Sequence, residues 1–188
     1  MVTPVELRAL LLSPEEAAAL EAPGGTDAAV LVPLYLDSGE LVAVFTERRP
    51  DLRRHAGEIS FPGGRQDLPD EDLRETALRE AEEEIGLPRD AVELVGALPP
   101  TGTRITGYKI HPFVGVIESG HAWTPEPAEV EAVLELSLTE LLRGYESKRL
   151  IRRGVPFKTP TYTVDGRLVW GATARIVESL LECLRPLL

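Results

Sequence analysis

Acidic side chains crowd one edge of a strongly helical segment, residues 70–85. Glu80 and Glu84 lie one helical turn apart, and Glu83 flanks them. Five apolar residues form a single arc that should pack on a sheet: Leu73, Ala77, Leu78, Ala81 and Ile85. The glutamates lie beside that arc, where like charges repel more strongly than in open water. A hard divalent cation such as Mg²⁺ or Mn²⁺ would relieve the repulsion. The alternative is a solvated acidic face balanced by distant arginines.

Arginines gather just upstream of this helix. Five of them fall within 18 residues: Arg48, Arg49, Arg53, Arg54 and Arg65. Guanidinium groups bind phosphates through paired hydrogen bonds, so the segment is a candidate for holding an anionic substrate, although a solvated loop is the alternative. The formal net charge of the chain is −11, which argues against nucleic acid as a partner.

The remaining patterns predict strands and helices that would position these residues. We expect two short helices within residues 4–22, a hairpin of strands at 28–36 and 41–46, and a strand at 58–61 that Pro62-Gly63-Gly64 breaks. Further strands are expected at 92–98 and 110–117, helices at 138–143 and 171–184, and a second hairpin over 161–170. Mixed strands with helices between them indicate an α/β or α+β sandwich.

The ends and the composition favour a cytoplasmic protein. The N-terminus lacks the features of a signal peptide, and no stretch is apolar for the roughly 18–20 residues of a membrane span. One cysteine, Cys183, permits no internal disulfide. We expect an N-terminal helical segment, residues 1–27, packed on a domain of residues 28–188.

The acidic helix resembles the signature of the Nudix family, G-x5-E-x7-R-E-U-x-E-E-x-G-U, with U aliphatic. Glu71, seven residues, and the run Arg79–Leu87 match the second half without gaps. At the glycine position this chain has Arg65, and Gly64 stands one residue upstream. The departure is consistent with an insertion of one residue before the helix.

A second motif resembles the coenzyme A diphosphatase branch of that family, L-L-T-x-R-[S/A]-x3-R-x3-G-x3-F-P-G-G. This chain matches at Thr46, Arg48, Arg53, Gly57 and at Phe61-Pro62-Gly63-Gly64. It departs at Val44 and Phe45, which stay apolar, and at Arg49, where a small residue is expected.

The resemblance implies a fold and a set of roles. The expected fold is the Nudix α/β/α sandwich around a mixed β-sheet. Family members hold Mg²⁺ or Mn²⁺ with helix glutamates, which here are Glu80, Glu83 and Glu84. Gly63 and Gly64 would approach the substrate, and one of the two would supply a carbonyl ligand to the metal. Arg79 would hold Glu83 in place.

Substrate contacts and the general base complete these expectations. Arg48 and Arg53 would bind substrate phosphates, and Glu129 is the candidate base, with a solvated surface glutamate as the alternative. The reaction expected is hydrolysis of the diphosphate of coenzyme A to 3′,5′-ADP and 4′-phosphopantetheine. The rivals are a Nudix enzyme for another nucleoside diphosphate derivative, such as ADP-ribose or a dinucleotide, and a non-catalytic nucleotide sensor. The sequence leaves open whether the protein forms a homodimer.

Overall fold

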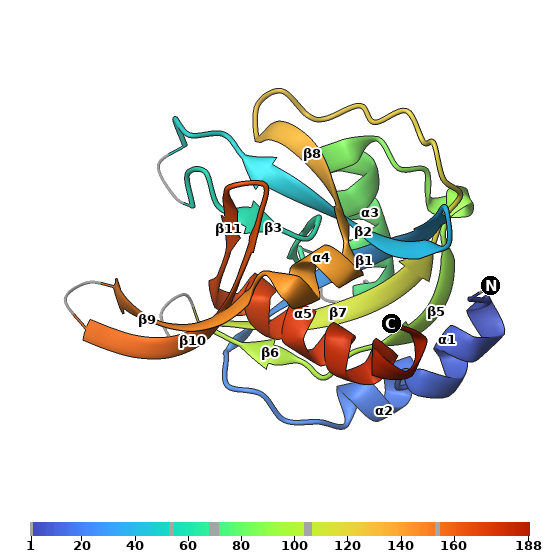
Figure 1. Cartoon of the computed structure of the whole chain (residues 1–188), viewed down its shortest axis with the longest axis horizontal. Helices are drawn as coiled ribbons and strands as arrows, with labels where there is room; N and C mark the ends of the chain where they lie inside the picture. Colours follow the sequence, from blue (N-terminus) through green and yellow to red (C-terminus); the bar gives the residue numbers. More distant parts are fainter. Residues whose placement is uncertain (1, 53–54, 68–71, 104–106, 153–154) are drawn as a thin grey trace.

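The computed structural model describes the chain except for residues 1, 53–54, 68–71, 104–106 and 153–154, and it describes the side chains outside 150–157. Its strands form two sheets, one of eight strands and one of three. Figure 1 shows helices on both sides of the larger sheet.

The central strand of the large sheet is β1, Thr26–Asp37. It forms an antiparallel hairpin with β2, Glu40–Arg48, through a turn at Ser38 and Gly39. On its other side it runs parallel to β7, Tyr108–Val116. The sheet is therefore mixed, and the predicted first hairpin is confirmed.

Five shorter strands complete this sheet, and they pair with β1, β2 or β7. They are β3 (Ile59–Ser60), β4 (Gly63–Arg65), β5 (Glu93–Ala97), β6 (Thr101–Gly102) and β8 (Val130–Ser137). A 3-10 turn, η1 (Arg89–Ala91), precedes β5.

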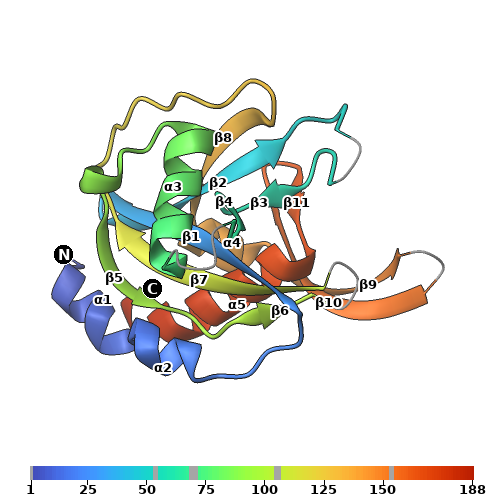
Figure 2. The same ribbon diagram turned by 180° about the vertical axis from the view of Figure 1, so that it is seen from behind.

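Two hydrophobic clusters lie on opposite faces of the sheet, because successive side chains of a strand point to opposite sides. On β2, Val42 and Val44 belong to one cluster, and Ala43 and Phe45 belong to the other. The first cluster packs under helix α3, Leu73–Ile85, which lies in front of the sheet in Figure 2.

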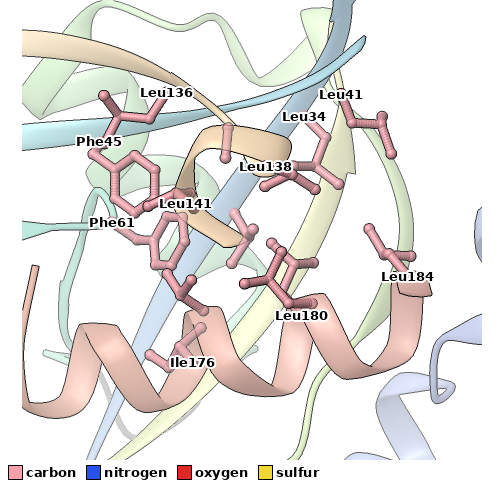
Figure 3. Packing of buried hydrophobic residues seen from close by; sticks show 14 of the residues in the cluster. Leu34, Leu41, Phe45, Phe61, Leu136, Leu138, Leu141, Ile176, Leu180 and Leu184 are labelled. Atoms are coloured by element: carbon pink, nitrogen blue, oxygen red, sulfur yellow. The ribbon is translucent and has the colours of Figure 1, made fainter. Parts of the chain in front are cut away.

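The second cluster packs under the C-terminal helix and the short helix before the small sheet. These are α5, Gly171–Leu184, and α4, Leu138–Arg143. Figure 3 shows Leu141 of α4 beside Phe45 and Phe61, and Leu180 and Leu184 of α5 in the same cluster. The two phenylalanine rings stack with their centroids 4.3 Å apart. Helices therefore cover both faces of a mixed sheet, which confirms the predicted α/β/α sandwich.

Two helices with side-chain caps precede β1. They are α1, Pro4–Leu10, capped by Thr3, and α2, Pro14–Ala18, capped by Ser13. The bridge between Leu12 and Ala97 ties their linker to β5. The first strand begins at Thr26, and the division of the chain at residue 27 stays a prediction.

The small sheet contains β9 (Tyr145–Arg152), β10 (Val155–Val164) and β11 (Arg167–Val169). The predicted hairpin over 161–170 is confirmed by the pairing of β10 with β11. The prediction did not include β9 or the first part of β10. Basic residues interrupt the apolar alternation there, so only the pairing of the two strands with each other reveals them. A 3-10 turn, η2 (Arg185–Leu187), follows α5.

The predicted strand break near the acidic helix is confirmed in part. The strand expected at 58–61 ends at Ser60, before Pro62, but Gly63 and Gly64 then begin β4 and pair with Val30 and Ala29 of β1. At these glycines, pairing with a neighbouring strand overrides local propensity.

In the described part of the chain, no helix is both long enough and apolar enough to cross a membrane.

Candidate functional site

Helix α3 carries the predicted metal ligands. It begins at Leu73, where the Asp72 carboxylate accepts a hydrogen bond from the Arg74 backbone N–H, and it ends at Gly86, whose φ of 69° suits glycine. Residues 70 and 71 of the predicted helix lie outside the described residues. Ala77, Ala81 and Ile85 are fully buried, so the glutamates beside them lie at the rim of the sheet.

Glu84 is a buried carboxylate. Its residue is 7% exposed, and its Oε2 accepts a hydrogen bond of 3.3 Å from the Gly63 N–H. The pKa of Glu84 is raised to about 8, mainly by burial; the Gly63 N–H and Arg48 lower it, and the charges of Glu80 and Glu129 add to the rise. The protein therefore holds an acidic group whose negative charge lacks full compensation.

Glu80 lies one turn earlier, against the backbone of β4. A Cβ placed on Gly64 would collide with both oxygens of the Glu80 carboxylate. Burial raises the pKa of Glu80, and the neighbouring Arg79 lowers it. The carboxylate thus packs on a glycine, which leaves its oxygens close to the β4 backbone.

Glu83 is more exposed and is held by Arg79. Arg79 Nη1 donates to Glu83 Oε2 at 2.9 Å, and Arg79 Nη2 lies 2.9 Å from Glu80 Oε1. Arg79 therefore spans two of the three predicted ligands, and Glu82, on the opposite side, pairs with Arg89.

Gly64 and Gly63 allow a matched test of this arrangement. In Gly64→Ala, we expect the new methyl group to push aside the flexible Glu80 side chain, lowering the affinity for Mn²⁺ about tenfold with the fold intact. In Gly63→Ala, the methyl group meets the backbone of β1 at Ala29 and Val30, so we expect a loss of folding stability. Isothermal titration with Mn²⁺ and thermal unfolding of both variants separate the two effects. Unchanged Mn²⁺ binding in a folded Gly64→Ala protein contradicts this description of Glu80.

Arg48 reaches the same site from the end of β2. The pairing of β2 with β8 is irregular here, because Glu47 pairs with Ala132 and Arg48 pairs with Val130, which leaves Glu131 of β8 out of register. Arg48 Nη1 lies 3.8 Å from Glu84 Oε1, and Nη2 lies 3.3 Å from Glu129 Oε2. The predicted phosphate-binding arginine and the predicted base therefore both adjoin the acidic helix.

The loop of residues 118–129 caps the C-terminal end of α3 through hydrogen bonds. The sequence did not predict this role. The carbonyls of Glu84, Ile85 and Gly86 have no partner within the helix. They accept hydrogen bonds, respectively, from Glu126 N at 2.9 Å, Thr124 N at 3.0 Å and His121 Nε2 at 3.3 Å.

An aromatic pair anchors this loop. The His121 ring packs on Trp123 at 4.7 Å, and Trp123 Nε1 donates to Glu135 of β8. Arg49 also fastens the loop, because its guanidinium donates to the Pro127 carbonyl at 2.6 Å. The position of Glu129 thus depends on contacts that no local pattern in the sequence reveals.

The remaining predicted arginines divide into two groups. Arg53 and Arg54 lie outside the described residues. Arg49 and Arg65 each pair with a nearby aspartate, Asp51 and Asp67. Of the described members of the cluster, Arg48 alone contacts the buried carboxylate Glu84.

The carboxylates suit a divalent cation in chemistry. Within the described ranges, no three His, Cys, Asp or Glu side chains converge as a ready set of ligands. The arginine contacts account for this, because Arg79 draws Glu80 and Glu83 and Arg48 approaches Glu84. Mg²⁺ needs only a few carboxylates besides waters and phosphates, and a buried carboxylate with a raised pKa is one that a cation would stabilise.

A pocket elsewhere on α3 does not contain this chemistry. A cavity of about 210 Å³ opens at the N-terminal end of the helix, between α2 and β7, with Ala17, Leu73 and Phe113 in its lining. Its walls are mostly apolar, and Glu80, Glu83 and Glu84 do not line it. The carboxylates of α3 are therefore the candidate functional site.

Comparison with known proteins identifies the family. The sequence profile of the NUDIX domain matches residues 25–154, which include α3, β2, β4 and the loop with Glu129. The chain belongs to the Nudix family. It is accordingly a Nudix hydrolase, an enzyme of the diphosphohydrolase class.

Relatives found by sequence agree with this assignment. The chain is 40% identical over 155 residues to a protein named uncharacterized Nudix hydrolase NudL from Klebsiella pneumoniae strain 342, covering 81% of this chain and 80% of the relative. The same name is carried by a relative from Salmonella newport, 38% identical over 155 residues with the same coverage.

Two solved structures share the fold of this Nudix hydrolase. The NUDIX domain of Shewanella oneidensis NrtR in complex with ADP-ribose has a TM-score of 0.56 at 17% identity and covers 90% of each chain. A Caenorhabditis elegans Ap4A hydrolase has a TM-score of 0.53 at 15% identity and covers 63% of this chain and 85% of its own.

Proposed function

We propose that this Nudix hydrolase cleaves the diphosphate bond of coenzyme A or its derivatives. One observation carries the proposal: both ends of the upstream motif lie against the acidic helix. Arg48 contacts Glu84, the Gly63 N–H donates to the same carboxylate, and Gly64 packs on Glu80. A motif that resembles the coenzyme A branch thus contributes to the wall of the site.

Glu80, Glu83 and Glu84 would hold Mg²⁺ or Mn²⁺, as the chemistry of the donor set allows. A bound cation supplies neutralisation of the charge that develops on the diphosphate oxygens, and it acidifies a water. Arg79 acts as a positioning residue, because its contacts with Glu80 and Glu83 fix two of these side chains. Arg48 and Arg53 would bind the phosphates of the substrate.

Glu129 is the proposed general base. Water attacks one phosphorus, its proton passes to Glu129, and the P–O–P bond breaks to leave 3′,5′-ADP and 4′-phosphopantetheine. Glu129 is half exposed and lies beside Arg48, and the loop that caps α3 holds it on the Glu84 side of the site.

In Glu129→Gln, we expect kcat to fall about 100-fold because the side chain can no longer accept the proton. Glu131→Gln, two residues further along, removes an exposed charge outside these contacts and should retain wild-type activity. Steady-state kinetics at one pH compare kcat of the two variants with kcat of the wild type. Equal rates for Glu129→Gln and the wild type exclude Glu129 as the base.

A substrate panel tests the proposed function. Coenzyme A, ADP-ribose and a dinucleoside polyphosphate are incubated with the enzyme and Mg²⁺ or Mn²⁺, and the products are separated by chromatography and weighed by mass spectrometry. We expect the greatest kcat/KM for coenzyme A. Cleavage of ADP-ribose with coenzyme A left intact would refute the substrate assignment while preserving the family.

The second candidate is another nucleoside diphosphate derivative. Its support is the fold shared with a domain solved with ADP-ribose and with an Ap4A hydrolase. Such substrates lack the 3′-phosphate and the pantetheine of coenzyme A, so 3′-dephospho-coenzyme A in the panel reports how much the extra phosphate contributes. A homodimer and a cytoplasmic location stay predictions.

A further inference from the structure

Arg48 and Arg79 both face the acidic site, but they are held differently. Arg79 lies 2.9 Å from a carboxylate oxygen of Glu80 and 2.9 Å from one of Glu83. Arg48 lies 3.3 Å from Glu129 and 3.8 Å from Glu84, and the second distance exceeds that of a hydrogen bond. Arg79 is therefore a close partner of its carboxylates, and Arg48 is a loose counter-charge.

The Arg48 side chain is also incompletely satisfied. It is about one quarter exposed, yet its Nε is buried and has no hydrogen-bond partner among the described residues. A buried N–H without an acceptor costs free energy. A stronger binding partner, either for the Arg48 guanidinium or for the Glu84 carboxylate, could therefore move Arg48 from its observed position.

The Glu84 carboxylate, in turn, lacks a close positive partner. The described groups that compensate its charge are the Gly63 N–H at 3.3 Å and Arg48 at 3.8 Å, while Glu80 and Glu129 repel it. A divalent cation carries twice the charge of a guanidinium, and Mg²⁺ approaches oxygen ligands to about 2.0–2.1 Å. It would compete directly with Arg48 for the same oxygens.

We propose that Arg48 is an exchangeable counter-ion, which lies against Glu84 and Glu129 in the metal-free enzyme and is released to the substrate phosphates when a divalent cation binds Glu84. The release makes a phosphate-binding guanidinium available only in the metal-loaded enzyme, which couples the two binding events. The exchange at the carboxylates does not depend on which diphosphate is the substrate. The identity of the anion that Arg48 then meets rests on the proposed function.

The test is Mn²⁺ binding without substrate, followed by electron paramagnetic resonance, in the wild type, Arg48→Gln and Arg167→Gln. Arg167 pairs with Glu47, the neighbour of Arg48, so its variant matches the change in charge. Because the cation no longer competes with a guanidinium, we expect Arg48→Gln to bind Mn²⁺ about fivefold more tightly, and Arg167→Gln to match the wild type.

Unchanged or weaker Mn²⁺ binding in Arg48→Gln overturns the exchange, since an arginine that only contacts substrate leaves this affinity alone or supports it. A wild type that binds no Mn²⁺ overturns the proposed function, and the exchange with it. The coenzyme A assay does not enter either result, so a failed exchange and a failed substrate assignment remain distinguishable.

A second measurement needs no variant. Phenylglyoxal modifies accessible arginines, and peptide mass mapping reports the rate at each one. In the wild-type enzyme, Mg²⁺ should accelerate modification of Arg48 and leave Arg167 unaffected. Slower or unchanged modification of Arg48 upon addition of Mg²⁺ contradicts its release.

Discussion

Glu84→Gln should lower kcat for diphosphate hydrolysis by about 10³-fold, because the amide replaces the buried carboxylate that would hold the catalytic cation. The substitution keeps the size of the side chain, and its amide oxygen can still accept the Gly63 N–H. The loss should therefore be one of chemistry, with the fold retained. Steady-state rates at saturating Mg²⁺ measure the loss of kcat, and circular dichroism measures whether the fold is retained.

Glu82→Gln is the matched control for this variant. Glu82 lies on the same helix, exposed and paired with Arg89. Its variant removes the same formal charge from α3 but should retain the rate of the wild type. A Glu84→Gln enzyme as fast as Glu82→Gln would remove Glu84 from the catalytic machinery.

Without metal, Glu84 should make the folded state less stable as pH rises. Its pKa is about 8 in the folded protein and near the ordinary 4.5 when unfolded. Between these values the folded state binds more protons than the unfolded state, so the free energy of unfolding falls with pH. The stabilisation is fully present below about pH 4.5 and is lost as pH approaches 8.

Glu84→Gln abolishes this dependence. In the presence of a chelator at pH 8 to 9, the variant should exceed the wild type in free energy of unfolding by about 3 kcal/mol, somewhat less than the full pKa difference because the site can relax and admit water. Urea unfolding of both proteins at pH 5 and pH 8.5 measures this difference in the free energy of unfolding. Added Mg²⁺ should reverse the order, since only the wild type keeps the carboxylate. A wild type that is the more stable at pH 8.5 under chelation would contradict the burial of an undercompensated charge.

The sequence predicts the parts of this site that depend on local periodicity. The spacing of Ala77, Ala81 and Ile85 fixes the buried face of α3, and from that face the positions of Glu80 and Glu84 at its rim follow. The pairing of Arg79 with Glu83 is likewise a neighbour relation along one helix. The first hairpin follows from two apolar runs separated by a turn.

Relations between distant segments escape such reasoning. His121 and Trp123 carry no motif, yet they anchor the loop that caps α3. Gly63 looks like a strand breaker until β1 provides a partner strand. The sequence predicts Arg48 as a phosphate ligand, but its contact with Glu84 joins β2 to α3, and no local pattern relates these two segments.

Crystals soaked in Mn²⁺ test most directly whether the carboxylates of α3 hold a divalent cation at the site of diphosphate cleavage. We expect a peak in the anomalous difference map within about 2.2 Å of oxygens of Glu80 or Glu84, with Arg48 moved away from Glu84. A well-ordered site with no peak there, and with Arg79 and Arg48 still on their carboxylates, would contradict the account.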